Sequence, residues 1–513
     1  MAVDPKHLPE DPQVLQQMVL DLMAQLDREF TERHKIEPLL RELLDAKRNR
    51  KSEQLSADQL ALFAAAWQAR QAEAEVPAPN DSDDDDNDAT AGMSGSIPKR
   101  RTGGRQPLPR HLKRERIVHD LADAEKHCAT CQQDLRSIGE ESSERYEYIP
   151  AQLSVIEDVC KKYACACTVK TATKPSQPIE KSTAGASLLA QVIVAKTADH
   201  LPLHRQEMIF QRHGVEISRK TMCGWLAETA NLLQALYQSA KGVLFQSKVI
   251  GTDDTGVKVL DTKLPFARTG RIWPYYGDKE HPVIVYDYTA TRERAGPEKF
   301  LEAYRGYLQA DAYGGYDAFF KNPARGLIEV GCWAHARRYH YKALDSDQSH
   351  MGPALLLIGQ LYRVEEQARG VSAEDRLRLR QLHARPILDK LHAYLEDIQV
   401  EVLPKSPAGR AVRYTLKNWT ALTRYCEDGD LEIDNNATER AIRGVAVGRN
   451  NWVFFGSDQG GSTAAVLRSF VASCQRVKVD PFAWFKDVLA RIADHPITRL
   501  AELLPHNWKP AQA

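Results

Sequence analysis

The sequence lacks the features of a membrane or secreted protein. No apolar run approaches the roughly 18 residues that a membrane-spanning helix needs, and the first residues, Met1–Asp11, lack the apolar core of a signal peptide. Nine cysteines among 513 residues are too few for a disulfide framework. The formal net charge is zero, with 69 basic and 69 acidic residues, so no overall excess marks a nucleic-acid binder. We therefore expect a cytoplasmic protein. The local clustering of its charges and cysteines is more informative than their totals.

The length predicts several domains, because a single hydrophobic core seldom grows past about 250–300 residues. In residues 13–36 apolar side chains recur at a helical spacing, at Leu15, Val19, Leu22, Leu26 and Phe30. Two interpretations stay open for this segment. It forms a coiled-coil dimer, or it packs as a helix on its own protein, and Pro38 should kink or end it in either case.

Between Val76 and Ser96 the composition changes to small and polar residues around an acidic run, Asp81–Asp88. This stretch is too polar to pack and predicts a flexible linker. A basic stretch follows, at Lys99, Arg100, Arg101, Arg105, Arg110, Lys113, Arg114 and Arg116. Such a block is either a solvated tail or a surface that contacts DNA phosphates without reading sequence.

Four cysteines follow as two close pairs, Cys128 with Cys131 and Cys165 with Cys167. Two thiolate pairs about 35 residues apart are typical of a tetrahedral structural zinc site. The second pair has one intervening residue rather than two, which strains the usual turn and leaves His127 or Cys160 as substitute ligands. The alternative is a set of buried cysteines without a metal.

Residues 182–240 predict helices, among them a pair that spans Leu203–His213 and the residues after Ser218, a predicted N-cap. A helix, a short turn at Gly214 and a second helix have the rhythm of a DNA-reading motif. Arg219 and Lys220 would then face DNA from the start of the second helix. An ordinary helical hairpin has the same pattern, and the sequence does not separate the two.

From about residue 248 the pattern changes to strands. Strands are predicted at Val249–Leu260, Arg271–Tyr276, His281–Tyr288, Tyr307–Asp311 and Gly326–Val330, with a helix from Ala334. Three strands in a meander followed by alternating strands and helices are the order of a ribonuclease-H-like α/β core. In that fold the first and fourth strands are neighbours. A mostly helical stretch follows, with a predicted helix start at Ser372 and a kink or division at Pro386.

Three carboxylates stand out by their context in this core. Asp253 and Asp311 are predicted to lie on the first and fourth strands, and Glu439 in the opening turn of a helix after Asn435-Asn436. Together they could hold two divalent cations, Mg²⁺ or Mn²⁺, about 3.5–4 Å apart, an arrangement that serves phosphodiester chemistry. Neighbouring side chains of a strand point to opposite faces, so only one of Asp253 and Asp254 can enter such a site.

A second polar group follows the fifth predicted strand. Cys332 and His335 could bind a metal, although a pair without visible partners is more often involved in packing and polar contacts. Arg337 and Arg338 could contact phosphates.

The sequence resembles transposases of the insertion sequence 66 family, because many of these segments match segments of that family in the same order along the chain. The matching segments are Arg50–Leu55, Lys162–Cys165, Leu201–Glu207, Asp253–Thr255, Gly306–Asp311, Gly331–Arg338, Asn435–Arg443 and Gly448–Ser457. The resemblance runs from about Arg50 to Trp508. It implies a DDE transposase, which hydrolyses strands at the ends of its element with the help of metal ions and joins the freed 3′ hydroxyl to target DNA.

The resemblance also implies roles for individual residues. It assigns Asp253, Asp311 and Glu439 as the metal-holding catalytic acids. It assigns Cys128, Cys131, Cys165 and Cys167 as zinc ligands. The possible DNA contacts are Arg219, Lys220, Arg337, Arg338, Arg443 and Arg449. The sequence departs from the family pattern at Asp254, where Glu is usual, at the contracted second cysteine pair, and at Asn450, where Lys is common.

These observations predict a multidomain α+β protein. The expected parts are an N-terminal helical region (1–75), a linker (76–110), a zinc-binding module (111–178), a helix-turn-helix-like region (179–244), a ribonuclease-H-like core in two parts (245–345 and 429–475) around an all-helical insertion (346–428), and a C-terminal helical tail (476–513). Its expected partners are double-stranded DNA and further copies of the chain on that DNA, in the bacterial nucleoid, and the resemblance also implies small accessory proteins of the same element. The alternatives are a DNA-binding protein that has lost catalysis, and a nuclease that cuts without joining.

Overall fold

The computed structural model describes residues 152–164, 169–173, 176–312 and 314–511, together with Gln59, Ala61, Phe63, Ala64 and Trp67. The chain divides into two compact units, one made of residues 1–76 and 162–513 and the other of residues 77–161. The predicted helix at 13–36, the linker, and all four expected zinc ligands lie outside the described residues.

A short antiparallel hairpin and a group of helices precede the sheet. The hairpin is formed by β1 (Lys162–Ala164) and β2 (Val169–Thr171), and the helices are α3 (Ala186–Thr197), α4 (Leu203–Arg212), α5 (Arg219–Leu232) and α6 (Gln234–Leu244). Helix α5 begins as the sequence predicted, because the Ser218 side chain accepts a hydrogen bond from the Thr221 N–H. Gly214 turns the chain between α4 and α5 with a φ of 74°, a conformation that glycine adopts at little cost.

The sheet has seven strands: β3 (Val249–Thr252), β4 (Thr255–Val259), β5 (Arg268–Tyr276), β6 (Ile284–Thr289), β7 (Gly306–Gln309), β8 (Leu327–Val330) and β9 (Phe454–Phe455). The expectation of one unbroken strand from Val249 to Leu260 was wrong. β3 and β4 both pair antiparallel with the long β5, but the ladder breaks between them at Asp253 and Asp254. Because of this break, Asp253 and Asp254 are not part of either strand. The two halves also have different parallel neighbours, since β7 pairs with β3 and β9 pairs with β4.

The predicted adjacency of the first and fourth strands is present, because β7 pairs in parallel with β3, and β8 in turn pairs with β7. Three short helical segments connect these strands: α7 (Ala295–Phe300), α8 (Asp317–Phe320) and η2 (Pro323–Arg325). Alternating side chains of β5 enter different cores, with Ile272 on one face and Trp273 on the other. The sheet is therefore covered on both faces, as expected of a mixed α/β protein.

Helices fill the stretch between β8 and the last acid. They are α9 (Trp333–Ala343), α10 (Gln348–Gln367), α11 (Ala373–Leu379), η3 (Arg380–Ala384), α12 (Arg385–Gln399), α13 (Pro407–Lys417), α14 (Trp419–Thr423) and η4 (Arg424–Cys426). They share a core of their own, into which Val330 of β8 packs. Ser372 caps α11 as predicted, and the expected division at Pro386 appears as the wider turn η3 directly before α12.

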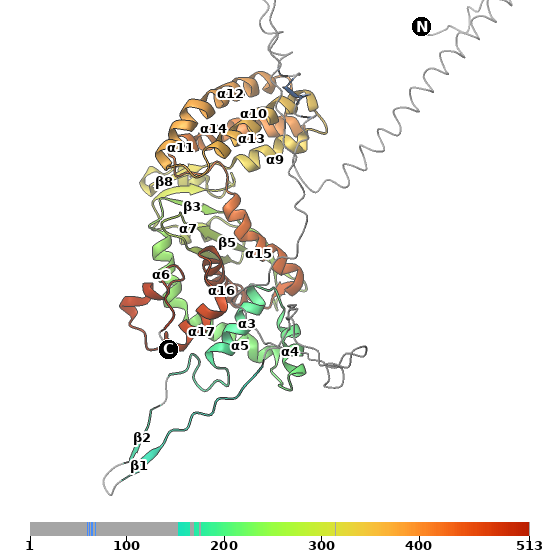
Figure 1. The fold of residues 1–513 in the computed structure, drawn as a ribbon. Coiled ribbons are helices and arrows are strands. Elements are labelled where there is room, and N and C mark those ends of the chain that lie inside the picture. The colour runs from blue at the N-terminus through green and yellow to red at the C-terminus, as the bar shows by residue number, and fades with distance from the viewer. Residues whose placement is uncertain are drawn as a thin grey trace, which may run out of the picture. The chain divides into compact units, whose positions relative to one another are not determined.

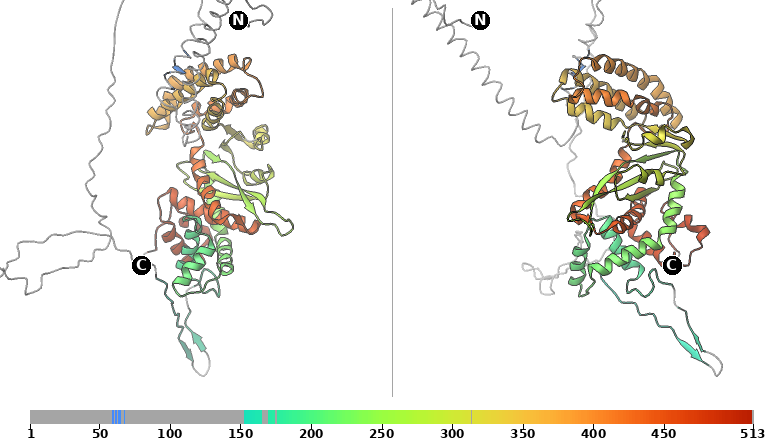
Figure 2. Two further views of the ribbon diagram at one scale, coloured as in Figure 1. Left: turned by 90° about the vertical axis from the view of Figure 1, so that its right-hand side faces the viewer. Right: turned by 180° about the vertical axis from the view of Figure 1, so that it is seen from behind.

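The chain then returns to the sheet in α15 (Asn436–Trp452), α16 (Asp458–Arg476), α17 (Pro481–Arg491) and η5 (Ile497–Leu503). Helix α16 lies along β6, and the hydroxyls of Ser469 and Ser473 accept hydrogen bonds from the strand's N–H groups. Helices α9–α14 and helices α3–α5 with α17 lie at opposite ends of the sheet (Figures 1 and 2). Within the described part of the chain, no helix is long and apolar enough to cross a membrane.

Candidate functional site

The register between β3 and β7 brings two of the predicted acids to the same place. Val249 lies opposite Tyr307 and Gly251 opposite Gln309. Continued for two residues, this parallel register sets Asp253 opposite Asp311, just beyond the ends of both strands. Because the break at Asp253 frees it from the ladder, its carboxylate is available at this edge.

The third acid arrives on α15, whose first turn packs directly on β3. The Asn435 side chain donates a 2.8 Å hydrogen bond to the Thr252 carbonyl. A Cβ on Gly251 would lie only 2.3 Å from the Thr438 hydroxyl, so only glycine permits this approach. Glu439 follows Thr438 in the first turn of α15, as the sequence predicted.

The electrostatics of Asp253 show that the three carboxylates influence one another. Burial raises the pKa of Asp253 to about 7. The N–H of Asp254 donates a 2.7 Å hydrogen bond to the Asp253 carboxylate and opposes this rise. The negative charges of Asp311, Asp254 and Glu439 raise the pKa further. Asp253 therefore lies in a partly desolvated cluster of negative charge.

Basic groups of α9 line the other side of Glu439. His335 Nε2 lies 3.7 Å from Glu439 Oε1, and Arg338 Nη2 lies 3.6 Å from Oε2. Glu439 Oε1 is buried and has no hydrogen-bond partner among the described residues. A buried carboxylate oxygen without a donor is costly, and a bound cation would satisfy it.

A hard divalent cation suits this donor set, since carboxylate oxygens are the ligands that Mg²⁺ and Mn²⁺ prefer. In the described residues, however, no three His, Cys, Asp or Glu side chains converge closely enough to enclose an ion as they stand. That Asp253, Asp311 and Glu439 hold such ions stays a prediction.

Asp254 has a different role from its neighbour. Its carboxylate, 2% exposed, accepts a 2.8 Å bond from Arg271 Nη1 and a 3.0 Å bond from Arg292 Nε. Two guanidinium groups therefore hold the Asp254 carboxylate, although its charge still acts on Asp253. Asp253 and Asp254 lie in the break between β3 and β4 and have different partners, the N–H of Asp254 for Asp253 and the two arginines for Asp254.

Comparison with known proteins identifies the family. The sequence model of the Transposase IS66 family matches residues 181–463, which is more than half of the chain and includes all three acids. The chain belongs to the Transposase IS66 family. A further model, the IS66 C-terminal element, matches residues 469–506. The protein is accordingly a transposase-family member with a DNA-binding role.

Two more IS66 models match the part of the chain before the helices. The zinc-finger binding domain of transposase IS66 matches residues 125–168, a range that contains all four predicted zinc ligands. The model described as Transposase C of IS166 homeodomain matches residues 39–117. The zinc-finger match supports zinc binding, and these modules support DNA as the partner.

Proteins of Sinorhizobium fredii (strain NBRC 101917 / NGR234) are similar along most of their length. Uncharacterized protein y4hP is 33% identical over 433 residues, 80% of this chain and 78% of the relative. Uncharacterized protein y4jD is 33% identical over 425 residues, 79% of this chain and 82% of the relative. The similarity therefore covers about four fifths of this chain.

Cys332 lies at the start of α9 and has a clear structural setting. Cys332 is 1% exposed, and its Sγ accepts a 3.3 Å hydrogen bond from the Asn435 N–H and lies 3.2 Å from His335 Nδ1. Burial raises the pKa of the Cys332 thiol to about 12, so it stays neutral. Cys332 thus ties the start of α9 to the start of α15 and orients His335 toward Glu439.

The predicted DNA contacts lie in several places on this IS66 protein. Arg219, 67% exposed, pairs with Glu207 of α4 at 3.1 Å, and Lys220 next to it is exposed. Arg443 is exposed on α15. Arg449 instead donates to the Thr255 hydroxyl at 2.9 Å and to the Gly256 carbonyl at 2.8 Å, which holds α15 on β4. Arg337 lies 5.9 Å from the ring of Tyr341 on α9.

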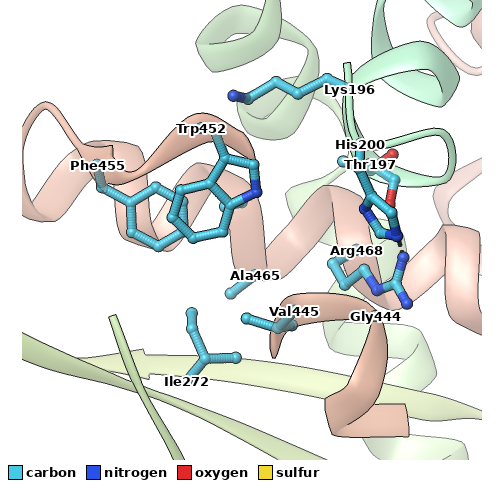
Figure 3. Close-up of a pocket in the computed structure, with 11 residues that line it drawn as sticks. Lys196, Thr197, His200, Ile272, Gly444, Val445, Trp452, Phe455, Ala465 and Arg468 are labelled. Carbon is cyan, nitrogen blue, oxygen red and sulfur yellow. Dashed lines mark hydrogen bonds between the residues drawn. The ribbon is translucent and has the colours of Figure 1, made fainter. Parts of the chain in front are cut away.

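A cavity of about 50 Å³ lies farther along α15, separate from the acids (Figure 3). Trp452 and Phe455 stack at 4.5 Å on one side of it, and Lys196, His200 and Arg468 lie on the other. Burial lowers the pKa values of Lys196 and His200, and the charge of Arg468 lowers that of His200 further. None of the three acids lines this cavity.

Sequence reasoning missed two tyrosines beside the acids. Tyr339 of α9 and Tyr414 of α13 stack with ring centroids 4.5 Å apart. They are far apart in the sequence and belong to helices whose packing was not predicted. The sequence shows that neither helix contains Asp or Glu, but it does not show that the two helices are neighbours.

Proposed function

We propose that this protein is a DDE transposase that cleaves DNA strands at the ends of its insertion sequence and joins them to target DNA. Asp253, Asp311 and Glu439 are the proposed catalytic acids. The observation that carries the proposal is the register of β3 and β7, which sets Asp253 opposite Asp311, together with the packing of the first turn of α15 on β3. Burial is the largest cause of the raised pKa of Asp253, and the charges of Asp311 and Glu439 add to it.

The strand order supports a ribonuclease-H-like core for this chemistry. The antiparallel β6, β5 and β3 are followed by the parallel β7 and β8, with the acids at the ends of the first and fourth strands. This is the arrangement that such a core requires. The helices between β8 and α15 then separate Glu439 from the other acids in the sequence but not in space.

Divalent cations, Mg²⁺ or Mn²⁺, would activate the attacking oxygen and stabilise the leaving one in strand cleavage and joining. The carboxylates would hold these ions and orient the phosphodiester between them. His335 and Arg338 would keep Glu439 oriented in the absence of DNA. Arg338 is also placed to contact a DNA phosphate at the site.

DNA is held by other parts of the chain in this proposal. A structural Zn²⁺ on Cys128, Cys131, Cys165 and Cys167 would fold one module. The α4–α5 pair, with Arg219 and Lys220 exposed at its second helix, would contact the terminal repeats. Two ends must meet for transposition, so we expect assembly of several copies on DNA, together with accessory proteins of the element, at the nucleoid.

A gel assay tests the proposal. Purified protein is incubated with labelled element-end DNA and a target plasmid in Mg²⁺ or Mn²⁺. Wild type should yield nicked ends and strand-transfer products, and Asp253→Asn, Asp311→Asn and Glu439→Gln should abolish both while still binding the ends. Binding without any metal-dependent product from wild type would instead favour a DNA-binding protein without catalysis. Nicked ends that are never joined would favour a nuclease.

A further inference from the structure

Helices α9 and α13 pack against each other and form a strongly basic surface next to Glu439. We call the exposed sides of these two helices the α9/α13 surface. Neither helix contains Asp or Glu. Together they carry Arg337, Arg338, Lys342, Arg410, Arg413 and Lys417. A one-sign surface of this kind attracts a polyanion.

The cations of α13 are exposed and are not neutralised. Arg410 Nη1 donates to the Lys405 carbonyl at 3.2 Å, and Arg413 donates to the Pro404 carbonyl. Within the described residues, neither guanidinium forms an ion pair with a carboxylate, and Lys417 one turn later is also exposed. The positive charge of α13 is therefore available to phosphates.

Two stacked tyrosines lie on the same surface. The rings of Tyr339 and Tyr414 are 4.5 Å apart and inclined by 25°, and Tyr339 is 43% exposed. One face of the Tyr339 ring is thus covered by Tyr414 while the residue remains open to solvent. An exposed aromatic ring among cations is the combination that binds unpaired nucleic acid, because a base can stack on the ring while phosphates contact the cations.

The stack is connected to the candidate acids on both sides. On one side, the Tyr414 hydroxyl lies close enough to Asp311 and to the backbone N–H of Ala312 for both to act on its pKa. On α9, His335 lies four residues before Tyr339 and therefore on the same helix face, and it lies 3.7 Å from Glu439. A strand that leaves the acids in this direction would reach the tyrosines first.

We propose that the α9/α13 surface binds an unpaired DNA end, with one base stacked on Tyr339 and its phosphates held by Arg410, Arg413 and Lys417. The inference rests on the proposed function, since this DNA end would be the one beside the cleaved phosphodiester. A fully paired duplex offers the cations its phosphates but has no free base for Tyr339. The surface therefore distinguishes a frayed or opened end from intact duplex.

The test compares forked and fully paired oligonucleotides of one sequence by fluorescence anisotropy, with no Mg²⁺ or Mn²⁺ added, so that nothing is cleaved while the proposed structural zinc stays bound. Wild type should prefer the fork. Tyr339→Ala should lose about tenfold in fork affinity, within the range for one base stacked on an aromatic ring, and keep its duplex affinity. Tyr339→Trp should retain the preference, because the ring face remains.

The charges are tested in the same assay. Arg410→Glu with Arg413→Glu should weaken the binding of both ligands. A plot of the logarithm of the fork-binding constant against the logarithm of the salt concentration should also become less steep. Its slope should change by about 0.7 for each phosphate that the protein no longer neutralises. Lys279→Glu is the matched control. It reverses one positive charge, half of the change in the double variant, at an exposed site between β5 and β6, at the end of the sheet away from Asp253, and should change the affinity for neither ligand.

A second measurement uses wild type alone. A 2-aminopurine at the first unpaired position of the fork should lose fluorescence on binding as it stacks on Tyr339. Equal affinity of wild type for both ligands, unquenched 2-aminopurine, or an unchanged preference in Tyr339→Ala would overturn the inference. Failure of wild type to cleave element ends, with the fork preference intact, would count against the proposed function and leave this inference standing.

Discussion

The Asn435 side chain donates a 2.8 Å hydrogen bond to the backbone carbonyl of Thr252, the residue directly before Asp253. Both groups are buried, and the bond joins segments 183 residues apart in the sequence. The first turn of the helix that carries Glu439 is thereby fixed to the strand that carries Asp253. The helical insertion can therefore lie between these acids in the sequence without separating them in space.

Asn435→Ala should lower the free energy of unfolding by about 1–3 kcal/mol, because it leaves the buried Thr252 carbonyl without its donor. Urea denaturation measures the change. Asn507→Ala is the matched control, since Asn507 makes a similar 3.1 Å bond to the Ala501 carbonyl at an exposed site. Equal small effects from both variants would show that the Asn435 bond does not hold α15 in place.

Asp254→Asn should destabilise the protein by about 3 kcal/mol, because it leaves Arg271 and Arg292 without their shared buried partner. Asp261→Asn, which removes the partner of a 3.6 Å pair with Arg268, should cost less than about 1 kcal/mol. Urea denaturation of both variants at pH 7 makes the comparison. An Asp254→Asn protein as stable as wild type would contradict the structural role assigned to this acid.

The raised pKa of Asp253 predicts that the stability of the fold depends on pH. Its pKa in the fold is about 7, above the ordinary value of 3.8, so the folded state binds more protons than the unfolded state. Without metal, its contribution to stability should fall as the pH rises from about 4 to about 7, by at most about 4 kcal/mol. The difference between wild type and Asp253→Asn, measured by urea denaturation across this range, isolates this contribution. A difference that stays constant with pH would show that Asp253 is not in a desolvated acidic cluster.

Divalent cations should stabilise the fold through the same acids. Because a cation competes with the proton on Asp253, the rise in Tm on adding Mg²⁺ or Mn²⁺ should be larger at pH 8 than at pH 5.5. Glu439→Gln should reduce this rise, and Glu432→Gln, a matched change at an exposed residue on the chain leading to α15, should not. A Tm that does not respond to either cation at pH 8 would argue against metal binding by the free protein.

The zinc content of the purified protein tests the predicted zinc-binding module, whose four cysteines lie outside the residues that the structure describes. Metal analysis should find one Zn²⁺ per chain in wild type and none in Cys128→Ser, since loss of a ligand from a four-cysteine site removes the metal. Cys160→Ser discriminates between the ligand sets that the sequence leaves open. If it retains zinc, Cys160 is not a ligand, and Cys165 with Cys167, or His127, completes the site, whereas loss of zinc would make Cys160 a ligand.

The local features of the core were predictable, because each has a short-range cause. Alternating apolar residues predicted the strands, Ser218 and Ser372 predicted helix starts, and Pro386 predicted the division before α12. The break at Asp253 was not predictable, since it depends on which strands pair with each half of the segment. Contacts between residues far apart in the sequence could not be predicted either. Nothing in the sequence shows that Tyr339 stacks on Tyr414, or that Cys332 accepts a bond from Asn435.

The central claim is that Asp253, Asp311 and Glu439 themselves hold the cations that drive strand cleavage. Cysteine substitution tests it most directly, because a thiolate binds Mn²⁺ better than it binds Mg²⁺. Element-end cleavage by Asp253→Cys, Asp311→Cys and Glu439→Cys should be lost in Mg²⁺ and at least partly restored in Mn²⁺. Cleavage in Mg²⁺ at the wild-type rate by any of the three would contradict the claim, because that carboxylate would then not be needed to hold the metal.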